Sequence, residues 1–296
     1  MKDQIPLDPS ARADMAPQTA DGPREIAADV AYQRLAMVNV AFIGRPGAGD
    51  RRWTLIDAGV MGTTGLIERA AEERFGRNAR PAAIVMTHGH FDHIGGLKTL
   101  AEKWDTPIYA HRLELPYLDG SAAYPPPDAL TGGGLMPLLS PLFPRGPIDV
   151  SQWLHPLPDD GSLPSMPGWQ WLHTPGHAAG HISLWRESDR TLIAGDAFIT
   201  TGQESAYAVA VQKPEMHGPP MYFTPDWPSA RDSVRKLAAL EPELAVTGHG
   251  RPMQGAGFRA ALHTLARDFD AVAVPKHGRY VGNPATAADG SAYHKP

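Results

Sequence analysis

The sequence feature that most constrains the fold is a dense cluster of histidine and aspartate between an expected strand and an expected helix. The segment THGHFDH (residues 87–93) follows the apolar run AAIVM (82–86) and precedes apolar residues at helical spacing from Ile94 to Trp104. Three histidines and one aspartate in so short a loop can converge on one point while the rigid elements hold their direction. A solvated polar loop is the alternative, but this density of ligand side chains favours a metal site.

Three further motifs place one potential ligand each directly after a short apolar run. They are His177 in TPGHAAGH, Asp196 in IAGDAF and His249 in TGHG. Each should project from the carboxyl end of a strand, where the sites of layered α/β folds gather. We therefore expect five histidines and two aspartates at one edge of the fold.

The order of expected elements predicts an α/β protein in two halves, each a sheet with helices outside. Strands are expected over 35–43, 53–56, 82–86, 107–110, 169–174, 181–185, 190–195 and 243–248, and helices over 65–76, 94–104 and 258–272. The first two strands are expected to form a hairpin. Another helix is expected to open at Ser229, with Asp232 three residues on.

Length and local composition predict one large domain with irregular additions. We expect an extended arm at 1–30, the domain over 31–275 and a tail at 276–296. Two segments rich in proline, glycine and aromatic residues, 112–167 and 202–228, lack a sustained period and are expected to be inserts.

Composition narrows the chemistry that these clusters can perform. The 296 residues include no cysteine, so thiolate zinc sites, iron–sulfur clusters and a cysteine nucleophile are excluded. Lys and Arg number 27 against 32 Asp and Glu, a net charge of −5 that argues against a nucleic-acid partner. The sequence shows no signal peptide or membrane span, so we expect no membrane partner and a cytoplasmic protein.

In this order, HGHFDH, TPGH, GD and GHG resemble the motifs of the metallo-β-lactamase superfamily. The resemblance covers roughly residues 30–275 and includes LIDAG at 55–59. It implies a four-layer αβ/βα sandwich, in which two mixed β-sheets are flanked by helices.

The resemblance also implies a role for each strand-end residue. One metal ion would be bound by His88, His90 and His177, a second by Asp92, His93 and His249, and Asp196 would bridge the two. Asp57 in LIDAG resembles the family's aspartate beside the metal loop, and a loop-bracing or helix-capping role is an equal alternative. His181 is usually not a ligand in the family and opens a strand here, so a structural role is favoured.

These ligands predict a hydrolase without a serine or cysteine nucleophile. Imidazole and carboxylate donors suit two Zn²⁺ ions, although Fe²⁺ and Mn²⁺ accept the same donors. A metal pair can hold a bridging hydroxide, because it lowers the pKa of bound water from about 15.7 toward roughly 7, and it can polarise a carbonyl. Asp92 is the expected catalytic residue, because a carboxylate that touches this hydroxide can orient it and pass its proton to the leaving group.

Members of the superfamily catalyse many reactions, so the reaction must be inferred from features that are typical of individual branches. A bridging Asp196 points to the glyoxalase II, lactonase and acyl-hydrolase branches, which act on a thioester, lactone or ester of a small molecule. The alternatives are a persulfide dioxygenase-like enzyme with one iron, a weak β-lactamase and a metal-binding module without activity.

Four residues of the second insert are candidate contacts to an acyl substrate: Tyr207, His217, Tyr222 and Phe223. We expect the two inserts to fold together over the metal cleft as a lid with an apolar acyl pocket, because so many apolar side chains must be buried against something. A homodimer interface is the competing destination for the same side chains.

Overall fold

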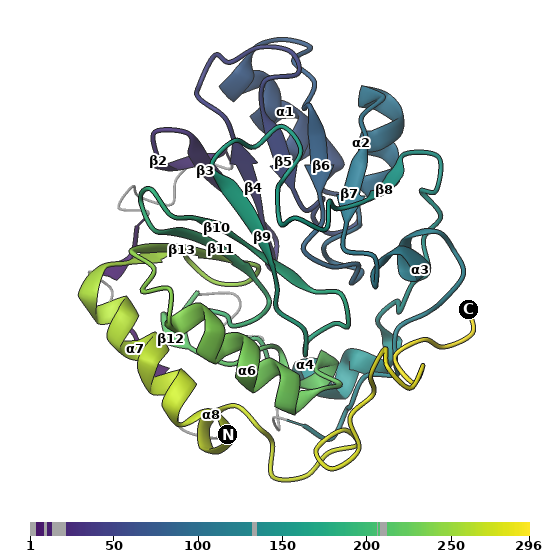
Figure 1. Cartoon of the computed structure of the whole chain (residues 1–296), viewed down its shortest axis with the longest axis vertical. Helices are drawn as coiled ribbons and strands as arrows, with labels where there is room; N and C mark the ends of the chain where they lie inside the picture. The colour runs from purple at the N-terminus through teal and green to yellow at the C-terminus, as the bar shows by residue number, and fades with distance from the viewer. Residues whose placement is uncertain (1–3, 9–10, 14–21, 132–134, 206, 208–211) are drawn as a thin grey trace.

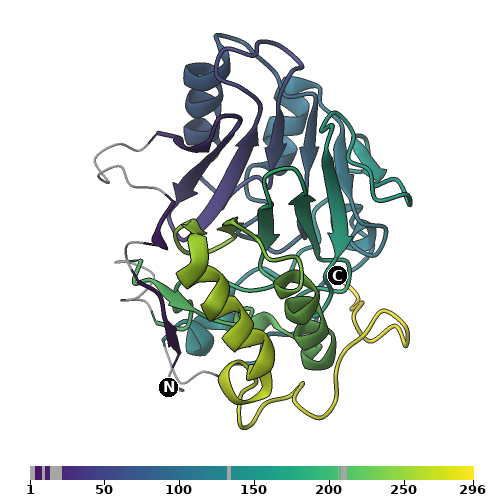
Figure 2. The same cartoon turned by 60° about the vertical axis from the view of Figure 1, so that its left-hand side comes forward.

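The computed structural model describes residues 4–8, 11–13, 22–131, 135–205, 207 and 212–296. Two β-sheets pack face to face and helices cover their outer faces, so the layers run helix, sheet, sheet, helix (Figures 1 and 2). The expected four-layer αβ/βα sandwich is confirmed. In the described part of the chain, no helix is long and apolar enough to cross a membrane.

The first sheet has seven strands, in the order β2-β3-β4-β5-β6-β7-β8. They are β2 (Arg24–Ala27), β3 (Val30–Leu35), β4 (Val38–Ile43), β5 (Thr54–Ile56), β6 (Ala83–Val85), β7 (Ile108–Ala110) and β8 (Leu154–Pro156). Strands β2 to β5 pair antiparallel, and β5 to β8 pair parallel. Helices α1 (Thr64–Phe75) and α2 (Leu97–Trp104) cover the outer face.

The second sheet has five strands, in the order β14-β13-β11-β10-β9. They are β9 (Trp169–His173), β10 (Ile182–Arg186), β11 (Thr191–Gly195), β13 (Leu244–Thr247) and β14 (Met253–Gln254). Strands β11 and β13 are parallel, and the other neighbours are antiparallel. Helices α6 (Trp227–Ala238), α7 (Gly255–Arg267) and α8 (Phe269–Val272) cover this sheet.

Short elements complete the fold. Strand β1 (Ile5–Pro6) pairs with β12 (Glu215–Met216). The first insert carries helices α3 (Leu115–Leu118) and α4 (Leu135–Leu139) and the 3₁₀ turn η2 (Ser140–Leu142), and the second carries the 3₁₀ turn η3 (Met221–Phe223).

Strand β4 shows how the sequence builds the layers. All six of its residues are buried, as befits a strand covered on both faces. Val40 and Phe42 pack toward α1, whereas Ala41 and Ile43 face the second sheet, because successive side chains point to opposite faces. The same alternation in β11 sends Ile193 toward the first sheet and its neighbours toward the outer helices.

The expected single strand at 35–43 is wrong. The chain turns at Ala36, whose φ of 57° is left-handed, so β3 ends at Leu35 and β4 begins at Val38. The sheet also begins earlier than residue 31, because β2 lies at 24–27, and it ends inside the first expected insert, because β8 lies at 154–156. β4 and β5 form the expected hairpin.

Helix α6 begins two residues before the position expected from Ser229. Asp226 caps it, since its carboxylate accepts the Ser229 backbone N–H at 3.1 Å and the Ser229 hydroxyl at 2.6 Å. Asp232 is instead a surface residue, near Arg231 and Arg235. The predicted start at Ser229 is therefore wrong, and the N-cap is Asp226, three residues earlier.

Replacing the true cap should destabilise the protein. We expect Asp226→Ala to lower the free energy of unfolding by about 1 kcal/mol, because the orphan backbone N–H of Ser229 and the Ser229 hydroxyl lose their acceptor. Urea unfolding followed by circular dichroism measures the change. Asp232→Ala is the matched control, and a larger loss from Asp232→Ala than from Asp226→Ala would contradict the assignment of the cap.

Candidate metal centre

The expected metal ligands meet where loops leave the carboxyl ends of strands from both sheets. The β6–α2 loop carries His88, His90, Asp92 and His93. From the second sheet, His177 follows β9, Asp196 follows β11 and His249 follows β13. All seven side chains are buried.

Their ligand atoms form overlapping groups that could each hold a metal ion. Within each group, all ligand atoms lie within 4.8 Å of one another. The groups are His88, His90 and His177; Asp92, His93 and His249; and His88, His93 and Asp196. The first two groups are the sets that the resemblance implied, and the third links them.

Asp196 lies between the two outer groups. One of its carboxylate oxygens is 3.4 Å from His177 Nε2, 3.1 Å from His249 Nε2 and 3.7 Å from His93 Nε2. Gly248 makes this position possible, because a Cβ there would lie 2.0 Å from the other carboxylate oxygen. The carboxylate therefore touches ligands of both groups, as a bridging ligand must.

Several buried polar atoms at this centre have no hydrogen-bond partner among the described residues. They include His88 Nε2, His93 Nε2 and Asp196 Oδ1. Buried polar atoms without partners are rare and costly. Imidazole nitrogen and carboxylate oxygen are the donors that zinc and similar divalent ions bind, so the site fits such ions.

The opposite ring nitrogens of two ligands are fixed by outer partners. His93 Nδ1 lies 2.8 Å from Asp57 Oδ2, and His249 Nδ1 lies 2.7 Å from the carbonyl oxygen of Met37. Each Nδ1–H donates outward, so Nε2 of each ring faces the centre and offers its lone pair to a metal ion once it is deprotonated. Asp57 also accepts hydrogen bonds from the backbone N–H and the hydroxyl of Thr87, both at 2.8 Å.

His181 supports Asp196 from behind. Its Nε2 accepts the backbone N–H of Asp196 at 2.9 Å, and its Nδ1 lies 3.0 Å from the carbonyl oxygen of Thr174. This pattern places the proton on Nδ1 and occupies both ring nitrogens. The arrangement agrees with the structural role favoured for His181.

Burial controls protonation at the first group of ligands. It lowers the pKa of His88 and His177 well below the ordinary value and that of His90 to about 3. Burial also acts on His93, but neighbouring carboxylates, led by Asp57, outweigh it and raise the pKa. The neutral imidazoles of the first group are in the form that binds metal.

Glu114 is a residue of the site that the sequence did not reveal. This carboxylate is completely buried and accepts the backbone N–H groups of Gly89 at 3.0 Å and Gly180 at 2.8 Å, together with the hydroxyl of Tyr124. It therefore ties the loop of His88 and His90 to the loop that follows His177. Burial raises its pKa to about 7. A lone glutamate in an irregular segment carries no sequence signal for this role.

The candidate substrate residues separate into two pairs. Tyr222 and Phe223 line a small cavity beside His90 and His177, and the Phe223 ring lies 4.9 Å from that of His90. Tyr207 is 73% exposed and does not line this cavity. His217 is buried near two glutamates, 3.3 Å from Glu215, and also lies outside the lining.

The two inserts meet over the metal loop. The Phe143 ring of the first insert lies 5.2 Å from that of Phe91, which stands between His90 and Asp92 in the sequence, and 6.2 Å from the Phe223 ring of the second insert. The backbone N–H of Asp128 also donates to the carbonyl oxygen of Tyr222 at 2.8 Å. These contacts put residues of both inserts beside the candidate metal ligands.

Loss of the Glu114 carboxylate should weaken metal binding. An amide offers only one acceptor oxygen, so in Glu114→Gln the side-chain NH₂ faces the backbone N–H of either Gly89 or Gly180, and one of the two hydrogen bonds that join the loops is lost. We expect Zn²⁺ affinity to fall by about 10–100-fold, as for other residues that orient ligands. Competition with a chromophoric chelator measures it, and Glu102→Gln on the exposed face of α2 is the control. Equal affinity of the two variants would show that Glu114 does not position the loops.

Comparison with known proteins agrees with this geometry. Residues 34–249 match the model of the metallo-β-lactamase superfamily. The Bacillus subtilis protein named "Probable metallo-hydrolase YflN" is 48% identical over 236 residues, 80% of this chain and 89% of that protein. Another B. subtilis protein, "Probable metallo-hydrolase YybB", is 34% identical over 170 residues, 57% of this chain and 64% of its own length.

Solved structures share the fold at low sequence identity. The metallo-β-lactamase SMB-1, bound to 2-mercaptoethanesulfonate, has a TM-score of 0.58 at 15% identity, over 84% of this chain and 95% of that one. The likeness concerns the fold alone. Given the family match over most of its length, the chain belongs to the metallo-β-lactamase superfamily.

Proposed function

We propose that this metal-dependent hydrolase binds two divalent metal ions, with Zn²⁺ the ion that suits its donors best, and cleaves an ester, lactone or thioester of a small molecule. The observation that carries the proposal is the position of Asp196. Its carboxylate touches residues of both candidate metal-binding groups, and one of its oxygens has no hydrogen-bond partner in the described part of the chain.

Each ion would have a complete set of protein donors. His88, His90 and His177 would hold one ion; Asp92, His93 and His249 would hold the other, with Asp196 shared. Ions bound in this way supply Lewis acidity for a carbonyl and lower the pKa of bound water. The protein's own task is to fix the direction of the donors, which Asp57 and the Met37 carbonyl do for two of them.

Asp92 is the residue that we propose moves the proton. Its carboxylate lies 3.4 Å from His249 Nε2 and is buried at the centre. In this position it can orient a water for attack on the carbonyl carbon, accept the proton of that water and give it to the leaving oxygen or sulfur.

The surroundings of the centre support an acyl substrate. The cavity next to His90 and His177 is lined by tyrosine, phenylalanine and proline side chains from both inserts and the C-terminal segment. An apolar wall with few polar groups is typical of small-molecule sites. The net charge of −5 also favours a small substrate over a nucleic acid.

The alternative functions fit the candidate ligand groups less well. A persulfide dioxygenase-like enzyme with one iron would leave Asp92, His93 and His249 without a function. A metal-binding module without activity is disfavoured because every expected ligand is present and buried. β-Lactam hydrolysis is expected to be weak, since fold likeness to β-lactamases does not determine the substrate. Assays of lactones, thioesters, phosphodiesters and β-lactams with the zinc-loaded protein compare these functions directly.

Removing the shared carboxylate should abolish most activity. Metal ions contribute several kcal/mol to transition-state stabilisation, so we expect Asp196→Asn to slow hydrolysis of 4-nitrophenyl acetate at least about a hundredfold. Asp159→Asn, at an exposed surface position, is the control. Circular dichroism of the same samples should show an unchanged fold. A rate within a few fold of the wild-type value would contradict the shared role of Asp196.

The lid should select substrates by acyl chain length. We expect Phe223→Ala to raise KM for long-chain esters more than for acetate, by a factor that reflects about 1.5–3 kcal/mol of lost burial. Steady-state kinetics over a series of 4-nitrophenyl esters measures this. An equal effect at every chain length would count against an acyl pocket.

Leu142→Ala, in the first insert, is the control for Phe223→Ala. Leu142 is 80% exposed, so its loss should leave KM unchanged at every chain length. The first insert exposes three more leucines, Leu130, Leu135 and Leu138, and such a group of apolar side chains supports a homodimer interface as a second proposal. Light scattering tests that second proposal, because Leu142→Ala should shift a dimer toward monomer if this surface is the interface.

A further inference from the structure

A buried asparagine in strand β4 contacts the turn that carries His249. Asn39 lies between Val38 and Val40 in this otherwise apolar strand and is 4% exposed. Asparagine is depleted in strands, and a buried amide is costly unless it is hydrogen-bonded. Asn39 is on the face of β4 that is turned toward the second sheet, because it alternates with Ala41. Neither the expected ligand motifs nor the packing of the core accounts for a polar residue at this position.

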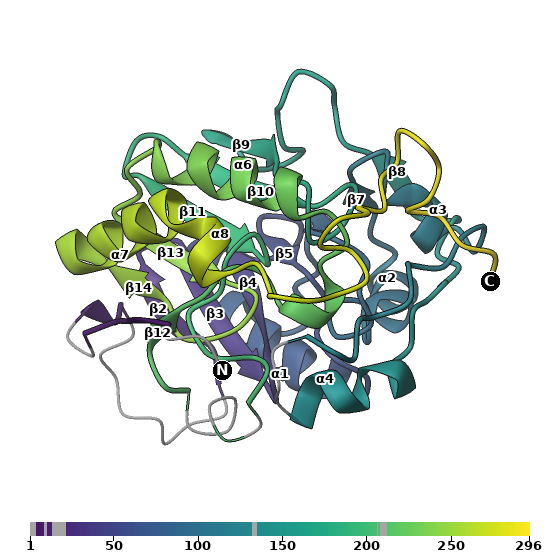
Figure 3. The ribbon, with the colours of Figure 1, turned by 90° about the horizontal axis from the view of Figure 1, so that it is seen from below.

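Asn39 makes three hydrogen bonds to the turn that follows β13, which lies beside β4 (Figures 1 and 3). Its side-chain amide donates to the carbonyl oxygens of Thr247 at 2.9 Å and Gly250 at 2.6 Å. Its backbone N–H donates to the carbonyl oxygen of Gly248 at 2.7 Å. These acceptors flank His249 on both sides along the chain. One residue of the first sheet therefore fixes the main chain around a candidate ligand of the second sheet.

The backbone hydrogen bond to Gly248 completes the edge of the first sheet. Strand β5 pairs with β4 over the register from Ala41 to Ile43 and does not reach Asn39. A buried backbone N–H needs an acceptor, so another group must replace the missing strand partner. The turn after β13 supplies this acceptor and joins the two sheets through the main chain.

The ring of His249 is held from the same end of β4. Its Nδ1 lies 2.7 Å from the carbonyl oxygen of Met37, two residues before Asn39. Its Nε2 lies 3.1 Å from a carboxylate oxygen of Asp196 and 3.4 Å from one of Asp92. One short segment thus holds both the ring and the main chain of His249, and this defines the direction of Nε2.

We propose that Asn39 is a positioning residue for His249: it holds the turn after β13 against β4 and thereby directs Nε2 toward Asp92 and Asp196. Binding groups must be held within about 0.5 Å and 10–20° of their working geometry, a tolerance that a shift of this turn exceeds. The ion that His249 would bind rests on the proposed two-metal function, whereas the position of the turn does not.

Amide hydrogen exchange of the full-length protein, treated with a chelator, tests the effect on the turn itself. Asn39→Leu keeps the branched shape of the side chain but removes both amide donors. We expect residues 244–252 to exchange at least about tenfold faster in this variant than in the wild type, and residues 84–94 to exchange at the wild-type rate. An unchanged rate over 244–252, or an equal acceleration of both segments, would overturn the proposal.

A double-mutant cycle with His249→Ala tests whether Asn39 acts through this ligand. Competition with a chromophoric chelator gives the Zn²⁺ affinity of each variant. We expect Asn39→Leu to weaken binding of one Zn²⁺ ion about 10–100-fold, and to have no further effect once His249 is replaced by alanine. A merely structural role would weaken binding equally in both backgrounds, and that result would overturn the proposal.

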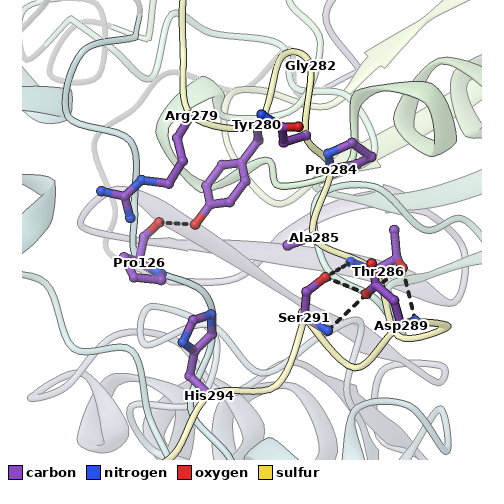
Figure 4. Close-up of a pocket in the computed structure, with 11 residues that line it drawn as sticks. Pro126, Arg279, Tyr280, Gly282, Pro284, Ala285, Thr286, Asp289, Ser291 and His294 are labelled. Atoms are coloured by element: carbon purple, nitrogen blue, oxygen red, sulfur yellow. Dashed lines mark hydrogen bonds between the residues drawn. The ribbon is translucent and has the colours of Figure 1, made fainter.

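Two further variants complete the experiment. Asn39→Ser is a milder change that keeps one donor in place of two, so it should show the same selective pattern if Asn39→Leu does not fold. Asn283→Leu makes the same exchange at an exposed position and should behave as the wild type. Asn283 lines a hollow beside the C-terminal segment, and a 2.6 Å hydrogen bond from the Tyr280 hydroxyl to the Pro126 carbonyl oxygen closes this hollow toward the metal centre (Figure 4).

The two measurements separate this proposal from the two-metal function. If exchange over 244–252 depends on Asn39 but the wild-type protein binds a single Zn²⁺ ion, only the two-metal proposal fails. If the wild-type protein binds two ions and Asn39→Leu changes neither exchange nor affinity, only the role of Asn39 fails.

Discussion

The carboxylate of Asp196 is the group on which the rest of the site depends. It is buried at the end of β11 in the second sheet, yet it contacts His93 from the β6–α2 loop of the first sheet. An ionised carboxylate in such a place is costly unless positive charge surrounds it. Imidazoles supply part of that charge, since His249 and His93 hold the pKa of Asp196 well below its usual range against burial. Divalent ions would supply the rest of the positive charge and would bind the ring nitrogens that have no hydrogen-bond partner among the described residues.

Residues outside the candidate ligand groups hold the loops around Asp196 in position. Asp57 and Glu114 are both buried carboxylates, and each joins loops that come from different elements. His181 holds the backbone of Asp196 itself. Beyond them, the two inserts and the C-terminal segment line the small cavity beside His90 and His177 with tyrosine, phenylalanine and proline side chains. The sandwich thus positions the candidate ligands, and the irregular segments cover one side of them.

The sequence predicted the convergence of the seven candidate ligands for a physical reason, whereas the four-layer sandwich was implied by the resemblance to the superfamily. Ligands directly after apolar runs must emerge at strand ends, and strand ends in layered folds converge. Glu114 could not be found in this way, because its role depends on backbone groups at residues 89 and 180 that are far apart along the chain. The sequence does not determine the start of α6, because Asp226 and Ser229 are both good capping residues and the geometry shows that Asp226 accepts the hydrogen bonds.

Metal stoichiometry tests the account most directly. The central claim is that Asp196 joins two complete ligand sets within one chain. Elemental analysis of protein prepared with excess zinc, exchanged into metal-free buffer and referred to the protein concentration, should give two ions per chain. One ion per chain, held by three of the seven ligands, would contradict the claim.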